Sequence, residues 1–269
     1  GTVPGDLLNA TLEQWRTQVR FAVKTLLDDC DEVFIGGYST GGALALDYAI
    51  KNKNVLTGLL LFNPCLKIKT EFSIMAKILD NVIDYRYIHN DYNIAAYQSK
   101  TYKAAANIYR LSNELQEHLV SGKISTPIFI AQSKSDITVD PEYNYNFYSK
   151  LNFNKNNTLI WFSNEEQKHS LNNKVLHYSS SDSVNNNIKN FGHLGIYMTE
   201  NDLHYGYNGR YKWCDHYWND KNKELECLNS KNNNIIYIEQ GEENVLYRRT
   251  TFNPNFEKLL SESLKFIGR

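Results

Sequence analysis

Hydrophobic residues follow two patterns along the chain, helical spacing in some segments and short continuous runs in others. Within 11–29, apolar side chains recur every three or four residues, which predicts an amphipathic helix, and Thr11 followed by Gln14 is typical of a capping box. Short apolar runs predict buried strands at 32–36, 55–62, 126–131 and 158–162. Further helices are expected at 43–51, from 141 to about 150, and at 254–267. Strands that alternate with helices indicate a mainly parallel α/β sheet with flanking helices.

Two regions depart from this alternation. Residues 71–120 are rich in Tyr, Ile and Ala and predict a mostly helical insertion. A long polar segment, rich in Asn, follows the strand at 158–162 and extends to about residue 235. Beyond it, 235–238 and 244–248 are expected to form a small hairpin.

Composition narrows the functional classes. The 269 residues include 42% hydrophobic residues, enough for a substantial core, and the net charge of -1 provides no basic field for nucleic acid. No apolar stretch reaches the roughly 18–20 residues of a membrane span. The cysteines match no zinc pattern, so no metal is expected. Cys30 and Cys65 are expected as buried thiols, and Cys214 and Cys227 either form a local disulfide or stay reduced.

The run Gly37-Tyr38-Ser39-Thr40-Gly41 stands between a predicted strand and a predicted helix. This is the arrangement of a nucleophile elbow, where a strained turn projects a serine from the carboxyl edge of the sheet. The flanking positions must be small, because strand and helix approach each other there. The backbone N–H of Thr40 is then a candidate oxyanion donor. The alternative is a glycine-rich tight turn with an incidental serine.

A nucleophilic serine needs a base, and the base needs an orienting carboxylate. In this kind of fold the chain order is serine, acid, histidine. Asp136 follows the strand at 126–131, which is the expected place for the acid. Asp140 is the competitor, but it precedes Pro141 and is better interpreted as a helix N-cap.

Five histidines follow the acid and are candidates for the base. His169 comes soon after the strand at 158–162, whereas His193 follows a longer excursion and has small neighbours in Gly192 and Gly195. The residues alone leave these two open. The complete set is His169, His177, His193, His204 and His216.

Several segments together resemble the α/β-hydrolase superfamily, closest to its bacterial carboxylesterase and monoacylglycerol-lipase-like branch. They are 1–7 (GTVPGDL), 11–15 (TLEQW), 37–42, Asp136, 188–206 and 253–256. The resemblance favours His193 over His169. It implies a triad of Ser39, Asp136 and His193, with the Thr40 N–H in the oxyanion hole. It also implies a hydrolase core at 1–70 and 121–269 and a helical cap insertion at 71–120.

The same resemblance implies strands that would precede Gly1, together with the second oxyanion donor. We therefore expect the N-terminal strands of the fold to be missing from this chain, and the chain not to fold on its own without that segment. Any export signal would also lie upstream, so localisation stays open.

The resemblance implies hydrolysis of a small-molecule, lipid-like or small acyl ester through an acyl-enzyme intermediate, with no metal or organic cofactor. The alternatives are a non-catalytic binding protein with the same fold, and a thioesterase or acyltransferase that uses the same triad.

Overall fold

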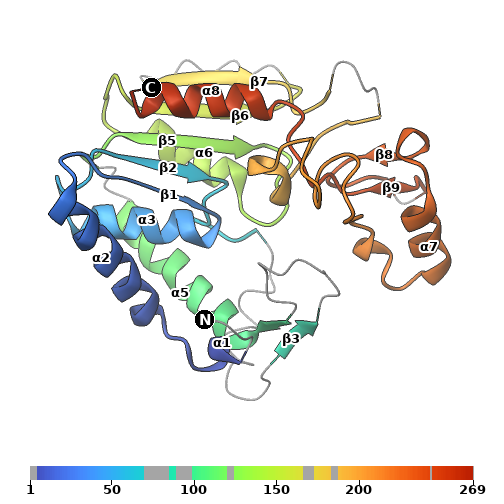
Figure 1. Cartoon of the computed structure of the whole chain (residues 1–269), viewed down its shortest axis with the longest axis horizontal. Helices are drawn as coiled ribbons and strands as arrows, with labels where there is room; N and C mark the ends of the chain where they lie inside the picture. The colour runs from blue at the N-terminus through green and yellow to red at the C-terminus, as the bar shows by residue number, and fades with distance from the viewer. Residues whose placement is uncertain are drawn as a thin grey trace. The chain divides into compact units, whose positions relative to one another are not determined.

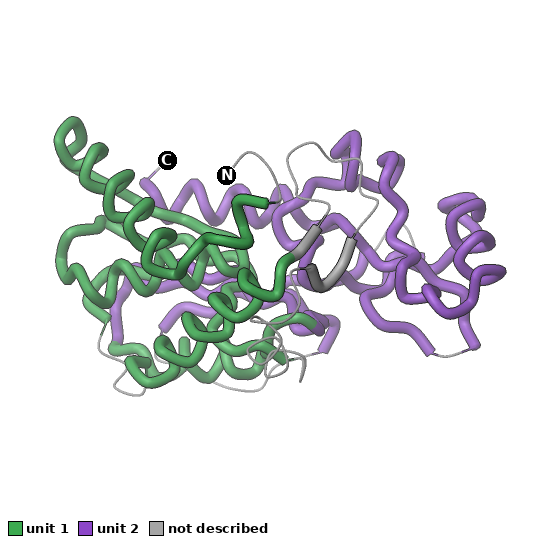
Figure 2. The backbone as a smooth tube through the Cα atoms, turned by 90° about the horizontal axis from the view of Figure 1, so that it is seen from below, with its two compact units in different colours: residues 1–128, 138–152 green, residues 129–137, 153–269 purple. Residues whose placement is uncertain are grey.

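The computed structural model describes residues 5–69, 85–88, 99–119, 124–165, 173–182, 187–242 and 244–268. The chain divides into two compact units, which Figure 2 distinguishes by colour. Unit 1 comprises residues 1–128 and 138–152, and unit 2 comprises 129–137 and 153–269.

Five strands form the main sheet, in the order β1-β2-β5-β6-β7 (Figure 1). The pairs β1–β2, β5–β6 and β6–β7 are parallel. The expectation of a mainly parallel α/β sheet with flanking helices is therefore confirmed. The strands are β1 (Phe34–Tyr38), β2 (Gly58–Phe62), β5 (Ile128–Ser133), β6 (Thr158–Phe162) and β7 (Lys174–Tyr178).

In unit 1, helices cover the strands. The helix α3 packs against β1 and β2, and α2 and α5 pack against α3. The Thr11–Gln14 capping box is present at the start of α2. Arg16 of α2 pairs with the buried Asp47 of α3 at 2.9 Å, which fixes the two helices to each other. The helices are α1 (Asp6–Asn9), α2 (Leu12–Asp29), α3 (Thr40–Lys51), α5 (Tyr102–Leu119) and α6 (Pro141–Ser149).

The predicted insertion is only partly described, because 70–84, 89–98 and 120–123 lie outside the described residues. Its described part contains α5 and two antiparallel strands, β3 (Tyr85–Ile88) and β4 (Ser99–Thr101). It is therefore not wholly helical. Ser112 of α5 donates a hydrogen bond to the Leu66 carbonyl at 2.9 Å, so this helix belongs to the packed layer of unit 1. The boundaries of a cap stay a prediction.

In unit 2, the helix α8 (Phe256–Phe266) packs against the strands. The Phe266 ring lies 5.6 Å from the Phe129 ring of β5, and Lys174 of β7 pairs with Glu262 at 3.4 Å. The sequence did not predict β7, which falls in the segment interpreted as polar. Its side chains are only half-buried or exposed, so it lacks the continuous apolar run by which the other strands were found.

Residues 187–253, which we call the C-terminal lobe, have a small core of their own around the disulfide between Cys214 and Cys227. Besides the two cysteines, the core contains Ile188, Tyr217, Ile235, Tyr237, Tyr247 and Phe252. The lobe includes α7 (Lys221–Asn229), β8 (Ile236–Tyr237), β9 (Tyr247–Arg248) and the 3₁₀ helices η1 (Leu194–Tyr197), η2 (Asp215–Tyr217) and η3 (Asn232–Asn234).

The predicted hairpin and the predicted burial of Cys30 were both wrong. The strands β8 and β9 are parallel, so they do not form a hairpin. A tight turn joins antiparallel strands, so parallel pairing excludes the expected hairpin. Among the thiols, Cys65 is buried as expected, but Cys30 is exposed at the end of α2.

Candidate active site

Ser39 lies in a strained turn between β1 and α3. It has φ 54° and ψ -117°, a conformation that non-glycine residues rarely adopt. Two backbone hydrogen bonds hold it: the Ser39 N–H donates to the Phe62 carbonyl at 3.0 Å, and the Cys65 N–H donates to the Ser39 carbonyl at 3.0 Å. The end of β2 therefore fixes the serine in the turn.

The glycines around Ser39 have different roles. A Cβ atom at Gly37 would overlap with the backbone of Gly41, and one at Gly42 would lie 2.9 Å from the Gly37 carbonyl oxygen and 3.1 Å from the Pro64 Cβ. By contrast, a Cβ at Gly41 would meet nothing within 4 Å. Close approach of strand and helix thus requires glycine at both 37 and 42, whereas a Cβ atom has room at 41.

A second unusual turn supports the first. Asn63, fully buried directly after β2, has φ 41°. The next carbonyl, that of Pro64, accepts a hydrogen bond from the Asn144 side chain at 2.8 Å. Thr40 begins α3, and the first N–H groups of a helix have no partner within the helix. The Thr40 N–H is therefore available by position for an oxyanion.

Unit 2 brings Asp136 and His193 together. His193 Nδ1 lies 2.6 Å from Asp136 Oδ2, and the two residues are 7% and 0% exposed. A carboxylate only accepts hydrogen bonds, so Nδ1 carries the proton and donates it. The Nε2 nitrogen of the neutral ring is then left with its lone pair, which is the state of a general base.

The loop before His193 is tied to the sheet. Ser133, the last residue of β5, donates its hydroxyl hydrogen bond to the Phe191 carbonyl at 2.5 Å. The Phe191 ring meets the Phe162 ring of β6 with centroids 5.1 Å apart. His193 directly precedes η1 as its N-cap residue. The segment before His193 is therefore held by contacts with β5 and β6, and the imidazole itself by Asp136.

The competing acid has a structural role. Asp140 caps α6 by accepting a hydrogen bond from the Tyr143 N–H at 3.0 Å, and it pairs with Lys67 at 3.0 Å. Burial opposes ionisation of Asp140, but Tyr143 and Lys67 together keep the pKa of its carboxyl below the usual value. This matches the interpretation of Asp140 as an N-cap.

The other candidate bases are placed elsewhere. His177 lies on β7, and burial lowers its pKa. His204 stacks with Tyr211 at 5.6 Å between ring centroids. His216 stacks on Tyr247, and burial, with a smaller contribution from Arg249, lowers the pKa of His216 to about 4. His169 lies outside the described residues.

The candidate residues thus fall into two groups. Ser39 and Thr40 belong to unit 1, whereas Asp136 and His193 belong to unit 2. The sequence analysis missed one further group, the carboxyl group of Glu239. It is 1% exposed and interacts electrostatically with Asp136 and with the His193 backbone. No motif surrounds Glu239 in the sequence, so only the fold reveals it.

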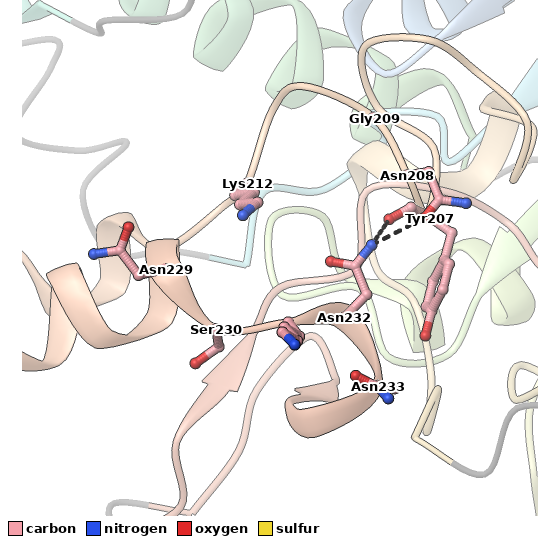
Figure 3. Close-up of a pocket in the computed structure, with 9 residues that line it drawn as sticks. Tyr207, Asn208, Gly209, Lys212, Asn229, Ser230, Asn232 and Asn233 are labelled. Carbon is pink, nitrogen blue, oxygen red and sulfur yellow. Dashed lines mark hydrogen bonds between the residues drawn. The ribbon is translucent and has the colours of Figure 1, made fainter.

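A pocket of about 510 Å³ lies in the C-terminal lobe (Figure 3). Two of its polar side chains make hydrogen bonds within the lobe: Asn232 donates to the Tyr207 carbonyl at 2.6 Å, and Lys212 to the Leu228 carbonyl at 2.7 Å. It contains none of the candidate catalytic residues. The lining residues are Tyr207, Asn208, Gly209, Lys212, Asn229, Ser230, Lys231, Asn232 and Asn233.

In the described ranges, no three His, Cys, Asp or Glu side chains are grouped as a metal ion would require. No helix in the same ranges is both long and apolar enough to cross a membrane.

The family model for serine aminopeptidases of the S33 type, Hydrolase_4, matches residues 9–171. This chain belongs to that family of α/β hydrolases. The matched range includes Ser39 and Asp136 but ends before His193. Within this α/β hydrolase, the histidine that contacts the acid therefore comes from beyond the matched range. His169 lies inside the range.

The chain is similar to several solved structures, of which the first supports this fold. The structure of the metagenome-derived lipolytic enzymes LipS and LipT is 22% identical with a TM-score of 0.54, and the match covers 61% of this chain and 68% of that one. A monoacylglycerol lipase from Paleococcus ferrophilus has 14% identity and a TM-score of 0.45, with 63% and 66% covered. A monoglyceride lipase variant from Saccharomyces cerevisiae, in complex with a substrate analogue, has 14% identity and a TM-score of 0.44, with 62% and 59% covered. No curated protein matches the chain.

Proposed function

We propose that this α/β hydrolase is a serine hydrolase that cleaves carboxylic esters with Ser39 as nucleophile, His193 as base and Asp136 as the orienting acid. The observation that carries the proposal is the buried hydrogen bond between His193 Nδ1 and Asp136 Oδ2 at 2.6 Å. This bond selects the ring tautomer in which Nε2 can accept a proton. A histidine kept only for packing would not need a fully buried carboxylate as its partner.

The strained backbone of Ser39 supports the same role. A φ of 54° at a non-glycine residue costs of order 1–3 kcal/mol, and such strain clusters at active sites. The chain order supports it too, because Ser39 directly follows β1 and Asp136 closely follows β5, and ligands of α/β sheets bind at the carboxyl ends of strands.

The proposed reaction has two halves. Ser39 Oγ attacks the ester carbonyl while His193 Nε2 takes the hydroxyl proton, and Asp136 stabilises the imidazolium that forms. The Thr40 N–H binds the developing oxyanion, and His193 returns the proton to the leaving alcohol. Water then attacks the acyl-enzyme by the same proton route, which releases the acid and restores Ser39.

The preference for esters rests on the sequence resemblance to carboxylesterases and monoacylglycerol lipases. The family description favours a second candidate, hydrolysis of an amide bond at an amino-terminal residue, because it names serine aminopeptidases. Both reactions use the same nucleophile, base and acid. Thioesterase or acyltransferase activity would differ in the leaving group or the acceptor, and a non-catalytic binding protein would show none of these reactions.

The test combines labelling with a substrate screen. Wild-type protein is expected to react with a fluorophosphonate probe and to hydrolyse p-nitrophenyl esters of graded acyl length faster than aminoacyl p-nitroanilides. Ser39→Ala should abolish labelling and hydrolysis, whereas Ser149→Ala, a hydroxyl at the end of α6, should retain both. His193→Gln should lose activity and His177→Gln should keep it. Labelling of Ser39→Ala at the wild-type rate would rule out Ser39 as the nucleophile.

A further inference from the structure

Glu239 is a buried carboxylic acid next to the acid–base pair. It is 1% exposed and lies just after β8 in the C-terminal lobe. A Cβ atom at Gly192 would overlap with the Glu239 side chain, so the carboxyl group fills the space that the missing side chain of Gly192 leaves open. Gly192 directly precedes His193. The carboxyl group therefore packs against the backbone that carries the candidate base.

The backbone of the same segment is also held from the lobe. The Glu239 N–H donates to the Asn190 side-chain oxygen at 2.8 Å, and the Thr250 hydroxyl donates to the Asn190 carbonyl at 2.6 Å. Glu239 thus approaches the segment before His193 with both its main chain and its side chain.

Among the described residues, the His193 backbone N–H is the one hydrogen-bond donor to the carboxyl group of Glu239. Burial raises the pKa of Glu239 to about 7. Arg249 lowers that pKa, the negative charge of Asp136 raises it, and the His193 backbone amide lowers it. The Arg249 guanidinium itself lies over the Trp213 ring at 5.1 Å.

Burial of the Glu239 carboxyl group lowers the stability of the fold, so folding by itself does not explain a carboxyl group at this position. A buried carboxyl group with a single hydrogen-bond donor leaves part of its desolvation cost uncompensated, at about 1–3 kcal/mol for an unpaired polar atom, and a buried charge costs more. An amide or an apolar side chain would fill the space beside Gly192 at lower cost. Perturbed carboxyl groups beside a candidate base point to function when the geometry agrees.

We propose that Glu239 is a positioning residue of the acid–base site, which supports the backbone of His193 and adds a second negative charge beside the Asp136–His193 pair. This inference rests on the proposed function of His193. When His193 takes the proton from Ser39 it becomes cationic, and an ionised Glu239 stabilises that charge together with Asp136. Below neutral pH, Glu239 is protonated and supplies only the packing.

The test is a pH series of kcat/KM for the best p-nitrophenyl ester, with wild type and Glu239→Gln. Gln preserves the shape of the protonated acid but cannot ionise. The ratio of wild type to variant should be near one at about pH 5.5 and rise to roughly 3–10 at about pH 8.5. Glu200→Gln is the matched control, because burial and Asp182 raise the pKa of Glu200 in the same unit. Its ratio to wild type should not change with pH.

A ratio that stays constant across the series would overturn the proposal and leave Glu239 a packing residue. A second measurement needs no catalysis. In Ser39→Ala, the ¹³C NMR signal of the Glu239 carboxyl carbon should shift through a transition near about pH 7, and the ¹H signal of the His193 Nδ1–H should differ above that pH from its position in the double variant Ser39→Ala with Glu239→Gln. Both results in a protein whose wild type shows no hydrolysis would refute the esterase proposal and keep the coupling. A His193 signal that is the same with and without Glu239→Gln would refute the coupling, whatever the activity.

Discussion

The elbow of unit 1 and the acid–base site of unit 2 are built in different ways. The geometry of Ser39 is set over a short distance, by the glycines at 37 and 42 and by hydrogen bonds to the end of β2. Asp136 and His193 are 57 positions apart in the sequence. Their pairing depends on β5, on β6 and on contacts from the C-terminal lobe. The candidate nucleophile thus depends on a short elbow and the end of one neighbouring strand, whereas the candidate base depends on much of a folded unit.

This difference predicts two modes of failure. Changes at the elbow should act through backbone geometry, because the turn leaves no room for a side chain at 37 or 42. Changes at the acid–base site should act through charge and orientation, because the imidazole is held by a carboxylate and by a supported loop.

The largest effect is expected at Asp136. Asp136→Asn should lower kcat/KM by roughly 10³–10⁴-fold with little change in folding, because the amide cannot hold the imidazole in the required tautomer. Asp140→Asn is the matched variant four residues on. It keeps a capping side chain at α6 and should retain activity within a few-fold. Equal losses from both substitutions would remove the distinction between the catalytic acid and the helix cap.

The next effect is on folding of the elbow. Gly37→Ala should cost at least about 3 kcal/mol of unfolding free energy, because its Cβ would overlap with the Gly41 backbone. Gly41→Ala should leave stability unchanged or slightly higher, because its Cβ meets open space and alanine favours a helix. Denaturant unfolding of the two variants tests the pair. A tolerated Gly37→Ala would show that strand and helix can separate at this turn.

The disulfide of the C-terminal lobe should contribute about 2–3 kcal/mol, as expected for a closed loop of this length. Replacement of Cys214 and Cys227 by alanine should lower the thermal midpoint and weaken the support that Glu239 gives to His193. The drop in kcat/KM should exceed that of Cys65→Ala, a buried thiol of unit 1. Addition of a reductant to the double variant is the control and should change nothing further.

The two regions also differ in how far the sequence predicts them. The buried strands and the capped helices were found because their apolar spacing and capping residues are local signals, as Thr11 with Gln14 shows. The strand β7 was missed because an edge strand with half-exposed side chains lacks an apolar run. The direction of β8 relative to β9 was wrong because pairing of such short strands is decided by the lobe core and not by a turn motif.

The same reasoning applies to the candidate site. Ser39 directly follows β1, and Asp136 comes three residues after β5. Their positions along the chain were therefore enough to select them. The choice between His193 and His169 could not come from spacing, because the long excursion after β6 can return either residue to the sheet. Glu239 could not be found at all. Its burial depends on Gly192 from a segment 47 positions earlier, as the overlap at that glycine shows.

The smallest expected effect is on the free energy of unfolding. It measures the cost of burying Glu239 in unit 2 and needs no substrate. Burial raises the pKa of Glu239 from 4.5 to about 7, so between these values the folded protein holds a proton that the unfolded chain has lost. The proton therefore stabilises the fold at low pH, and the stabilisation fades as pH rises through about 7. Relative to Glu239→Gln, the wild type should lose about 1.4 kcal/mol between about pH 6 and about pH 8. Parallel urea unfolding curves at the two pH values measure this. A constant difference would mean that the carboxyl group is solvated in the folded protein, and the acid–base site would then lack its second charge.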